Sequence, residues 1–326
     1  MWDVTVMGSG QDAGVPQVGC ACTQCRAARS DSALRRLAPS LLLKNEDTEQ
    51  AVVVDASPDI REQLDRYLPP LGLSSIRAVF ITHGHVGHYW GLPLLGKEGP
   101  DLKGVTVYAP VDVVNMLMAT PAISLMESRK NIRMEAMCPG RQGEAGGQGE
   151  QCGQGEPGGQ DELGGHGRRA EPVRIGDLSI EGFYVPHRQE LTQTVGFWLR
   201  GPERTLIYIP DVDRWTPEVV ALVRSADLAL LDGTFFSADE LGGTRKMGEI
   251  PHPPISESLR VFADLDPWHG GRDGHVDSGR GRGHAWPIIY FTHLNHTNPA
   301  GLDGPERDAV RRAGMDIAFD GMRMRI

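Results

Sequence analysis

Short apolar runs rich in β-branched residues recur along the chain, and Gly/Pro turns or polar segments separate them. Runs of about four to eight such residues between turns are typical of strands. The pattern predicts strands at Trp2–Met7, Ser40–Lys44, Ala51–Asp55, Ala78–Thr82, Val105–Ala109, Leu178–Val185, Thr194–Arg200, Thr205–Ile209, Leu228–Asp232, Ile288–Thr292 and Asp316–Phe319.

Segments with a helical spacing of apolar residues lie between these strands. They predict helices at Pro58–Tyr67, Val111–Thr120, Pro217–Ala226, Ser256–Ala263 and Pro305–Ala313. Ser57 is suited to cap the first helix, with Pro58 at its first position. Many strands interleaved with a few helices predict an α/β (α+β) fold in which helices flank two mixed sheets.

Two polar segments interrupt this pattern. Residues 140–171 consist mostly of Gly, Gln and Glu, and so little apolar surface predicts a disordered insertion. Residues 268–284 are rich in Gly, Arg and His, which favours a solvated surface insertion over a weak metal-binding tract. The sequence shows no tandem repeat and no domain boundary, so residues 1–326 are predicted to form a single domain.

Composition sets broad limits on partners and location. The chain has 326 residues, is 40% hydrophobic and carries a formal net charge of −10. This acidic balance argues against a stable nucleic-acid complex, but it is compatible with a local pocket for a small anionic substrate. Its apolar runs are far shorter than the roughly 20 residues of a membrane-spanning helix, and the N-terminus lacks the features of a signal peptide. A cytoplasmic globular protein without membrane contact is therefore expected.

Candidate chemistry is concentrated just after a predicted apolar strand. His83, His85 and His88 lie within six residues there, in the run Thr-His-Gly-His-Val-Gly-His. A turning backbone can direct the first two imidazoles to one ion and the third to an adjacent site, and neutral imidazole suits zinc, iron and manganese. The alternative is a run of surface histidines, which this spacing after an apolar strand disfavours.

Three further residues leave apolar strands in the same manner, namely His187, Asp211 and His293. Each of them alone would be interpreted as a polar strand cap. Their order along the chain, after the three-histidine run, instead indicates loops that converge on one rim of a sheet sandwich.

A second cluster of ligand-type residues lies near the N-terminus. The sequence has five cysteines, and three of them, Cys20, Cys22 and Cys25, lie within six residues. In a chain without a secretion signal this clustering indicates metal binding rather than disulfides. With His296 as fourth ligand they would form a tetrahedral structural zinc site. The alternative is a set of free or redox-active thiols.

The order of histidines and aspartate resembles the metallo-β-lactamase superfamily, whose fold is an αββα sandwich with metals at the rim of the sheets. The resemblance implies one or two catalytic divalent metals, which could be zinc, manganese or iron, and a metal-bound hydroxide as nucleophile. It implies the ligands His83, His85 and His187 for the first metal, His88 and His293 for the second, and Asp211 for both.

Two positions bear on how far this resemblance extends. Asp55, at the end of a predicted strand, matches a superfamily aspartate that would orient a ligand imidazole, although a simple turn residue is the alternative. Gly87 stands where the superfamily has an aspartate directly before the third histidine. Because glycine supplies no ligand atom, the second metal site is expected to be weak or empty.

Further motifs resemble one branch of the superfamily. Residues 8–17, Gly-Ser-Gly-Gln-Asp-Ala-Gly-Val-Pro-Gln, together with the three cysteines resemble the branch of phosphoribosyl cyclic phosphate phosphodiesterase and coenzyme PQQ synthesis protein B. His252 precedes a predicted helix, where phosphodiesterases of this fold place a histidine that contacts phosphate or protonates the leaving oxygen. A plain loop histidine is the alternative for His252.

These observations leave three functions open. The first is hydrolysis of a phosphodiester or cyclic phosphate, in which Asp55, Asp211 and His252 would serve catalysis. The second is a role in PQQ biosynthesis, as an iron-dependent oxidative enzyme. The third is a non-catalytic relative that keeps the fold and the structural zinc. Site chemistry favours the first, because fold likeness alone does not fix function. The resemblance also suggests a homodimer.

Overall fold

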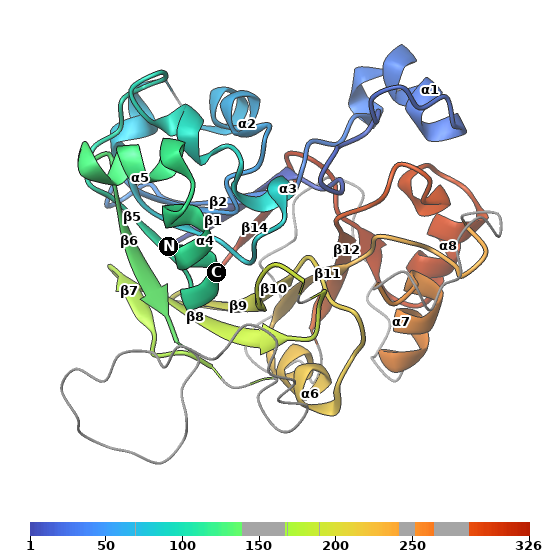
Figure 1. Cartoon of the computed structure of the whole chain (residues 1–326). Coiled ribbons are helices and arrows are strands. Elements are labelled where there is room, and N and C mark those ends of the chain that lie inside the picture. The colour runs from blue at the N-terminus through green and yellow to red at the C-terminus, as the bar shows by residue number, and fades with distance from the viewer. Residues whose placement is uncertain (69, 139–166, 168, 189, 241–251, 264–286) are drawn as a thin grey trace.

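The computed structural model describes the whole chain except residues 69, 139–166, 168, 189, 241–251 and 264–286 (Figure 1). The described strands are β1 (Asp3–Gly8), β2 (Ser40–Asn45), β3 (Gln50–Val54), β4 (Ile76–Phe80), β5 (Val105–Pro110), β6 (Ile132–Met137), β7 (Val173–Ile175), β8 (Leu178–Val185), β9 (Thr194–Arg200), β10 (Thr205–Ile209), β11 (Leu228–Asp232), β12 (Ile288–Thr292), β13 (Asp316–Ile317) and β14 (Arg323–Arg325).

These strands form two seven-stranded mixed sheets. Their order is β14-β1-β2-β3-β4-β5-β6 in the first sheet and β13-β12-β11-β10-β9-β8-β7 in the second. The two termini meet in the first sheet, because β1 pairs antiparallel with β14. The sheets pack face to face with helices outside, so the predicted αββα sandwich is confirmed (Figure 1).

Helices cover the outer faces of the two sheets. The described helices are α1 (Thr23–Ser30), α2 (Ile60–Tyr67), α3 (Val86–Tyr89), α4 (Val111–Met118), α5 (Pro121–Ser128), α6 (Pro217–Ser225), α7 (Ile255–Val261) and α8 (Pro305–Arg312), with short 3₁₀ turns η1 (Ser32–Leu34), η2 (Pro70–Ser75), η3 (Leu92–Leu95) and η5 (Pro299–Gly301). Apolar side chains of α2, α4 and α5 pack on the first sheet, and those of α6, α7 and α8 pack on the second. In the described residues, no helix combines the length and the apolar character needed to cross a membrane.

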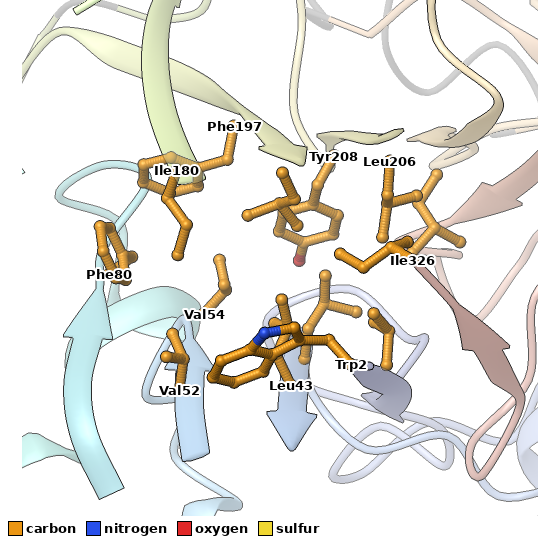
Figure 2. Packing of buried hydrophobic residues seen from close by; sticks show 14 of the residues in the cluster. Trp2, Leu43, Val52, Val54, Phe80, Ile180, Phe197, Leu206, Tyr208 and Ile326 are labelled. Carbon is orange, nitrogen blue, oxygen red and sulfur yellow. The ribbon is translucent and has the colours of Figure 1, made fainter. Parts of the chain in front are cut away.

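The space between the sheets holds the main hydrophobic core (Figure 2). Val52 and Val54 of β3 point into this core, whereas Val53 between them points to the helices on the outer face. This alternation follows from the two-residue period of a strand. Trp2 is fully buried in the core, and its Nε1 donates to Asp177 Oδ1 at 2.7 Å. Each large side chain buried here contributes roughly 1.5–3 kcal/mol.

The structure corrects several local predictions. The helix expected at Pro58 begins two residues later, at Ile60, with Asp59 as its N-cap residue. Ser57 precedes this N-cap residue, and its Oγ accepts from Asp59 N–H at 3.1 Å and donates to Gln63 Oε1 at 2.9 Å. The sequence pattern also missed six elements, which are β6, β7, β14, α1, α3 and α5. In β14, for example, only the middle of Arg-Met-Arg is buried, so its apolar signal is weak.

The two predicted insertions fall mostly outside the described residues. Residues 268–284 lie wholly outside them, and so does most of 140–171. At the end of the latter segment, Ala170 is buried and its N–H donates to Gly182 O at 2.6 Å. This end of the segment therefore packs against β8.

Sheet topology brings many strand ends to one rim. Strands β3 and β4 are parallel in the first sheet, and β10, β11 and β12 are parallel in the second. The carboxyl ends of neighbouring parallel strands lie on the same edge, where connecting loops can bring polar side chains together. The residues that follow these strands form the site described next.

Candidate metal centre

The loop after β4 carries the three-histidine run to this rim. It turns at Gly84, whose N–H donates to Thr192 Oγ1 at 2.9 Å, and continues into the short helix α3. His83 Nε2 lies 2.8 Å from His85 Nδ1, whereas His88 lies one turn further on. The imidazoles of His83 and His85 therefore lie together, and the imidazole of His88 faces a second group of residues.

The first cluster consists of His83, His85 and His187, whose ring nitrogens lie within 4.8 Å of one another. His187 follows β8, so the cluster joins both sheets. Burial and the charge of His88 lower the pKa of His83 well below its usual value. Burial also lowers the pKa of His85 to about 4. Both rings are therefore neutral at pH 7, which is the form that binds a metal.

The second cluster consists of Asp12, His88 and His293. Asp211, just after β10, faces this cluster: its Oδ2 lies 3.2 Å from His88 Nε2 and 3.4 Å from His293 Nε2. Its other oxygen, Oδ1, lies 3.6 Å from His187 Nε2 in the first cluster. Asp211 therefore stands between the two clusters with one oxygen toward each.

The chemistry of these atoms fits divalent metal ions. Buried polar atoms nearly always have a hydrogen-bond partner, yet five buried atoms at this rim have none in the described part of the chain. They are Asp12 Oδ1, His88 Nε2, His187 Nε2, Asp211 Oδ2 and His293 Nε2. A tetrahedral ion with ligands at about 2.0–2.2 Å places neighbouring ligand atoms about 3.3–3.6 Å apart. The separations around the second cluster are 3.2–3.8 Å.

Side chains behind the clusters hold the imidazoles in place. Their hydrogen bonds to the Nδ1 atoms join the pairs Asp55–His88 at 2.7 Å, Asp213–His187 at 2.9 Å and Thr234–His293 at 2.9 Å. A bond to Nδ1 fixes the tautomer and leaves Nε2 for a metal. The predicted orienting position of Asp55 thus corresponds to a contact in the structure.

Backbone strain accompanies two of these residues. Asp55 and His293 adopt positive φ angles, 62° and 61°, although neither is glycine. This conformation costs roughly 1–2 kcal/mol for a residue with a side chain. Such strain is typical of functional sites, where surrounding contacts over-determine the backbone.

His252 lies at the same rim, within 4.8 Å of ligand-type atoms of His187 and Asp211. It is 7% exposed, and its Nδ1 lies 2.7 Å from Asp232 Oδ2. Burial alone would lower the pKa of His252, but the charge and hydrogen bond of Asp232 outweigh burial and raise it to about 9. His252 is therefore protonated at neutral pH, with its Nε2 turned away from Asp232.

A separate cluster consists of Cys20, Cys22, Cys25 and His296. His296 Nδ1 lies 3.4 Å from Cys20 Sγ and 3.5 Å from Cys22 Sγ. Tetrahedral zinc with sulfur at about 2.3 Å and nitrogen at about 2.0 Å would separate these atoms by about 3.5 Å. The backbone N–H groups of Gln17 and Cys25 donate to Cys25 Sγ at 3.3 Å and to Cys22 Sγ at 3.4 Å, respectively.

Every predicted ligand and catalytic residue thus lies at one of these two places, but sequence analysis missed three others. Asp12 is in a glycine-rich turn, and its spacing from the histidine run carries no signal. Asp213 follows a predicted ligand by two residues and could have been considered. Asp232 ends an apolar strand in the same way as Asp55, so this signal was present and overlooked.

Two sheets with helices outside and paired His/Asp clusters at one rim define a protein of the metallo-β-lactamase fold. A family model described as the β-lactamase superfamily domain matches residues 50–269. The chain belongs to this superfamily, within the branch that contains coenzyme PQQ synthesis protein B.

Curated relatives match over nearly the full length. Coenzyme PQQ synthesis protein B of Methylorubrum extorquens (strain PA1) is 30% identical over 350 residues, which cover 98% of this chain and 99% of the relative. The protein of the same name from Rhizobium meliloti (strain 1021) is 29% identical over 336 residues, covering 99% and 97%.

Solved structures share the fold. Zn²⁺-bound PqqB from Methylobacterium extorquens has a TM-score of 0.74 at 24% identity and covers 99% of this chain and 100% of its own. A diphosphatase from the PhnP family has a TM-score of 0.64 at 21% identity, covering 100% and 98%. Human tRNase Z, short form, has a TM-score of 0.59 at 15% identity, with 99% coverage of both chains.

Proposed function

We propose that this protein is a metal-dependent hydrolase that cleaves a phosphodiester or cyclic phosphate of a small anionic substrate. One observation carries the proposal: buried, unpartnered ligand-type atoms converge in two adjacent clusters, and Asp211 presents one oxygen to each. Metals bound by these two clusters would polarise a phosphoryl oxygen and lower the pKa of a water molecule.

The residues of the chain have distinct parts in this proposal. The first and second clusters would hold the metals, and Asp211 would fix their relative position. His252 would donate a proton to the leaving oxygen, because it is protonated near neutral pH and lies beside the first cluster. Asp232 would orient His252 and maintain its charge.

Names of related structures support this class of reaction. Two proteins with the same fold are named a diphosphatase and a tRNase Z. Both names denote cleavage at phosphorus. Their identity to this chain is low, so the support extends to the reaction class and no further.

The test is hydrolysis of bis(p-nitrophenyl) phosphate and of 2′,3′-cyclic nucleotides with added Zn²⁺, Mn²⁺ or Fe²⁺. We expect turnover of these diesters over the monoester p-nitrophenyl phosphate, and loss of turnover in Asp211→Asn. His252→Ala should slow an alkyl diester by about 10²–10⁴-fold and an aryl diester far less, because a good leaving group needs little protonation. An absence of diester turnover with all three metals would contradict the proposal.

Whole-chain likeness favours a second candidate, a role in PQQ biosynthesis. The relatives named coenzyme PQQ synthesis protein B align over 98–99% of this chain. A bacterial strain that lacks its own protein B would make PQQ again when supplied with this chain. Restored PQQ production that is lost in His85→Ala would favour this role over hydrolysis of an unrelated diester.

A further inference from the structure

The absence of a side chain at Gly87 leaves a place beside His88 that another residue fills. A Cβ built on Gly87 would lie 2.0 Å from Asp12 Oδ1, 2.6 Å from its Cγ and 2.7 Å from its Cα. The carboxylate of Asp12 thus occupies the space that a side chain at residue 87 would need.

The position of this carboxylate is that of a ligand. Asp12 Oδ1 is buried without a hydrogen-bond partner in the described residues, and it lies 3.4 Å from His88 Nε2 and 3.8 Å from His293 Nε2. The second cluster therefore contains a carboxylate oxygen that lies beside the free ring nitrogens of both imidazoles.

Backbone hydrogen bonds fix the segment that carries Asp12. Leu294 N–H donates to Ser9 O at 2.9 Å, and Gln11 N–H donates to Leu294 O at 2.9 Å. Ser9 is held in turn by Asp320, whose Oδ1 accepts from its N–H at 2.9 Å and from its Oγ at 2.7 Å. Asp12 is therefore one residue from a backbone bond to the loop of His293, so its carboxylate and that imidazole are positioned together.

We infer that Asp12 is the anionic ligand of the second metal, supplied from the N-terminal turn in place of the side chain that Gly87 lacks. The inference deepens the proposed function and rests on its metal site. It reverses the expectation that the glycine leaves this site weak or empty. Because Gly87 has no side chain, the carboxylate of Asp12, which is distant in sequence, can lie beside His88.

The experiment measures metal content and affinity in the full chain, independently of turnover. Metal-free protein is titrated with Zn²⁺ or Co²⁺ against a chromophoric chelator, and equivalents per chain are counted by elemental analysis after dialysis. Wild type should hold two equivalents beyond the zinc of the cysteine cluster. Asp12→Ala should lose one of them, with affinity at that site weaker by more than about 100-fold, because a direct ligand contributes more than the 10–100-fold of a supporting residue.

Two further variants sharpen the test. Asp12→Asn keeps the shape and removes the charge, so it should weaken the same site even if Asp12→Ala folds poorly. Asp65→Ala removes an exposed acid on α2 and should change nothing.

The outcomes separate this inference from the proposed function. A second equivalent that persists in Asp12→Ala and Asp12→Asn with wild-type affinity overturns the inference, whether or not the protein hydrolyses diesters. Loss of that equivalent in both variants supports it, even if no diester is turned over and the proposed reaction fails. The Co²⁺ absorption bands provide a second readout, since removal of one oxygen ligand changes their intensity.

Discussion

The variant Asp55→Asn tests whether the proton on His88 Nδ1 is needed for metal binding at the second cluster. Asp55 is fully buried, and its Oδ1 accepts from Thr82 N–H and Thr82 Oγ1 at 2.9 Å each. Its Oδ2 lies 2.7 Å from His88 Nδ1, which must donate if His88 Nε2 is to bind a metal. Asparagine can keep the two bonds to Thr82 through its oxygen, but it then presents an NH₂ group to His88 Nδ1.

Two donors cannot share that contact, so the imidazole would change tautomer. Nδ1 would become the acceptor and Nε2 would carry the proton, which blocks the ligand atom. Restoring the metal-binding tautomer leaves a buried unsatisfied donor at a cost of roughly 1–3 kcal/mol. That cost corresponds to a loss of affinity of about 5–150-fold, in line with the 10–100-fold typical of residues that support a ligand.

The assay is the chelator competition with Asp55→Asn and wild type side by side. Asparagine tolerates the positive φ of residue 55 better than other substitutes do. The metal-free variant should therefore remain folded, with unfolding free energy lower by roughly 1–3 kcal/mol. Second-site affinity equal to that of wild type in a folded variant would refute the reasoning, because it would show that His88 needs no donor bond at Nδ1.

Three further outcomes are expected. Burial alone would lower the pKa of His88, but the charges of Asp55 and Asp211 raise it well above its usual value, so metal binding must displace a proton. Calorimetric titrations in buffers of different ionisation enthalpy should show this release, and affinity should fall as pH falls; equal heats in all buffers would contradict it. Asp232 raises the pKa of His252 to about 9, so Asp232→Asn should lower the pKa of His252. In a pH profile of kcat, the loss of turnover at alkaline pH should then begin at a lower pH. An unchanged profile would exclude His252 as the proton donor. Cys22→Ser should remove about one zinc per chain and lower the melting temperature, and unchanged zinc content would exclude the cysteine cluster as a zinc site.

Strong local patterns made most of the fold and the site predictable. Apolar runs at Leu178–Val185 and Thr205–Ile209 coincide with strands β8 and β10, because short runs rich in β-branched and aromatic residues between turns favour strands. His187 and Asp211 then follow directly from strand ends. Residues that reach the site only because segments distant in sequence pack together were not predictable in this way.

Asp12 shows why the remainder was missed. Its neighbours in sequence are small and polar, and it reaches His88 only because two distant segments pack together. A strand-end rule cannot detect a ligand delivered by tertiary packing. The absence of an aspartate at residue 87 is visible in the sequence, but its effect on the second cluster depends on Asp12, which fills the space beside Gly87.

The second cluster and the cysteine cluster are built from the same pair of chain segments. Residues 9–25 supply Asp12 and the three cysteines, and residues 293–298 supply His293 and His296. Zinc at the cysteine cluster would therefore hold together the same two segments whose approach creates the second cluster. The backbone bonds between Ser9, Gln11 and Leu294 hold them between these points. Cys22→Ser should therefore also weaken Zn²⁺ binding at the second cluster, although it changes none of that cluster's own residues. The chelator competition measures this, and a second-site affinity equal to that of wild type would contradict the coupling.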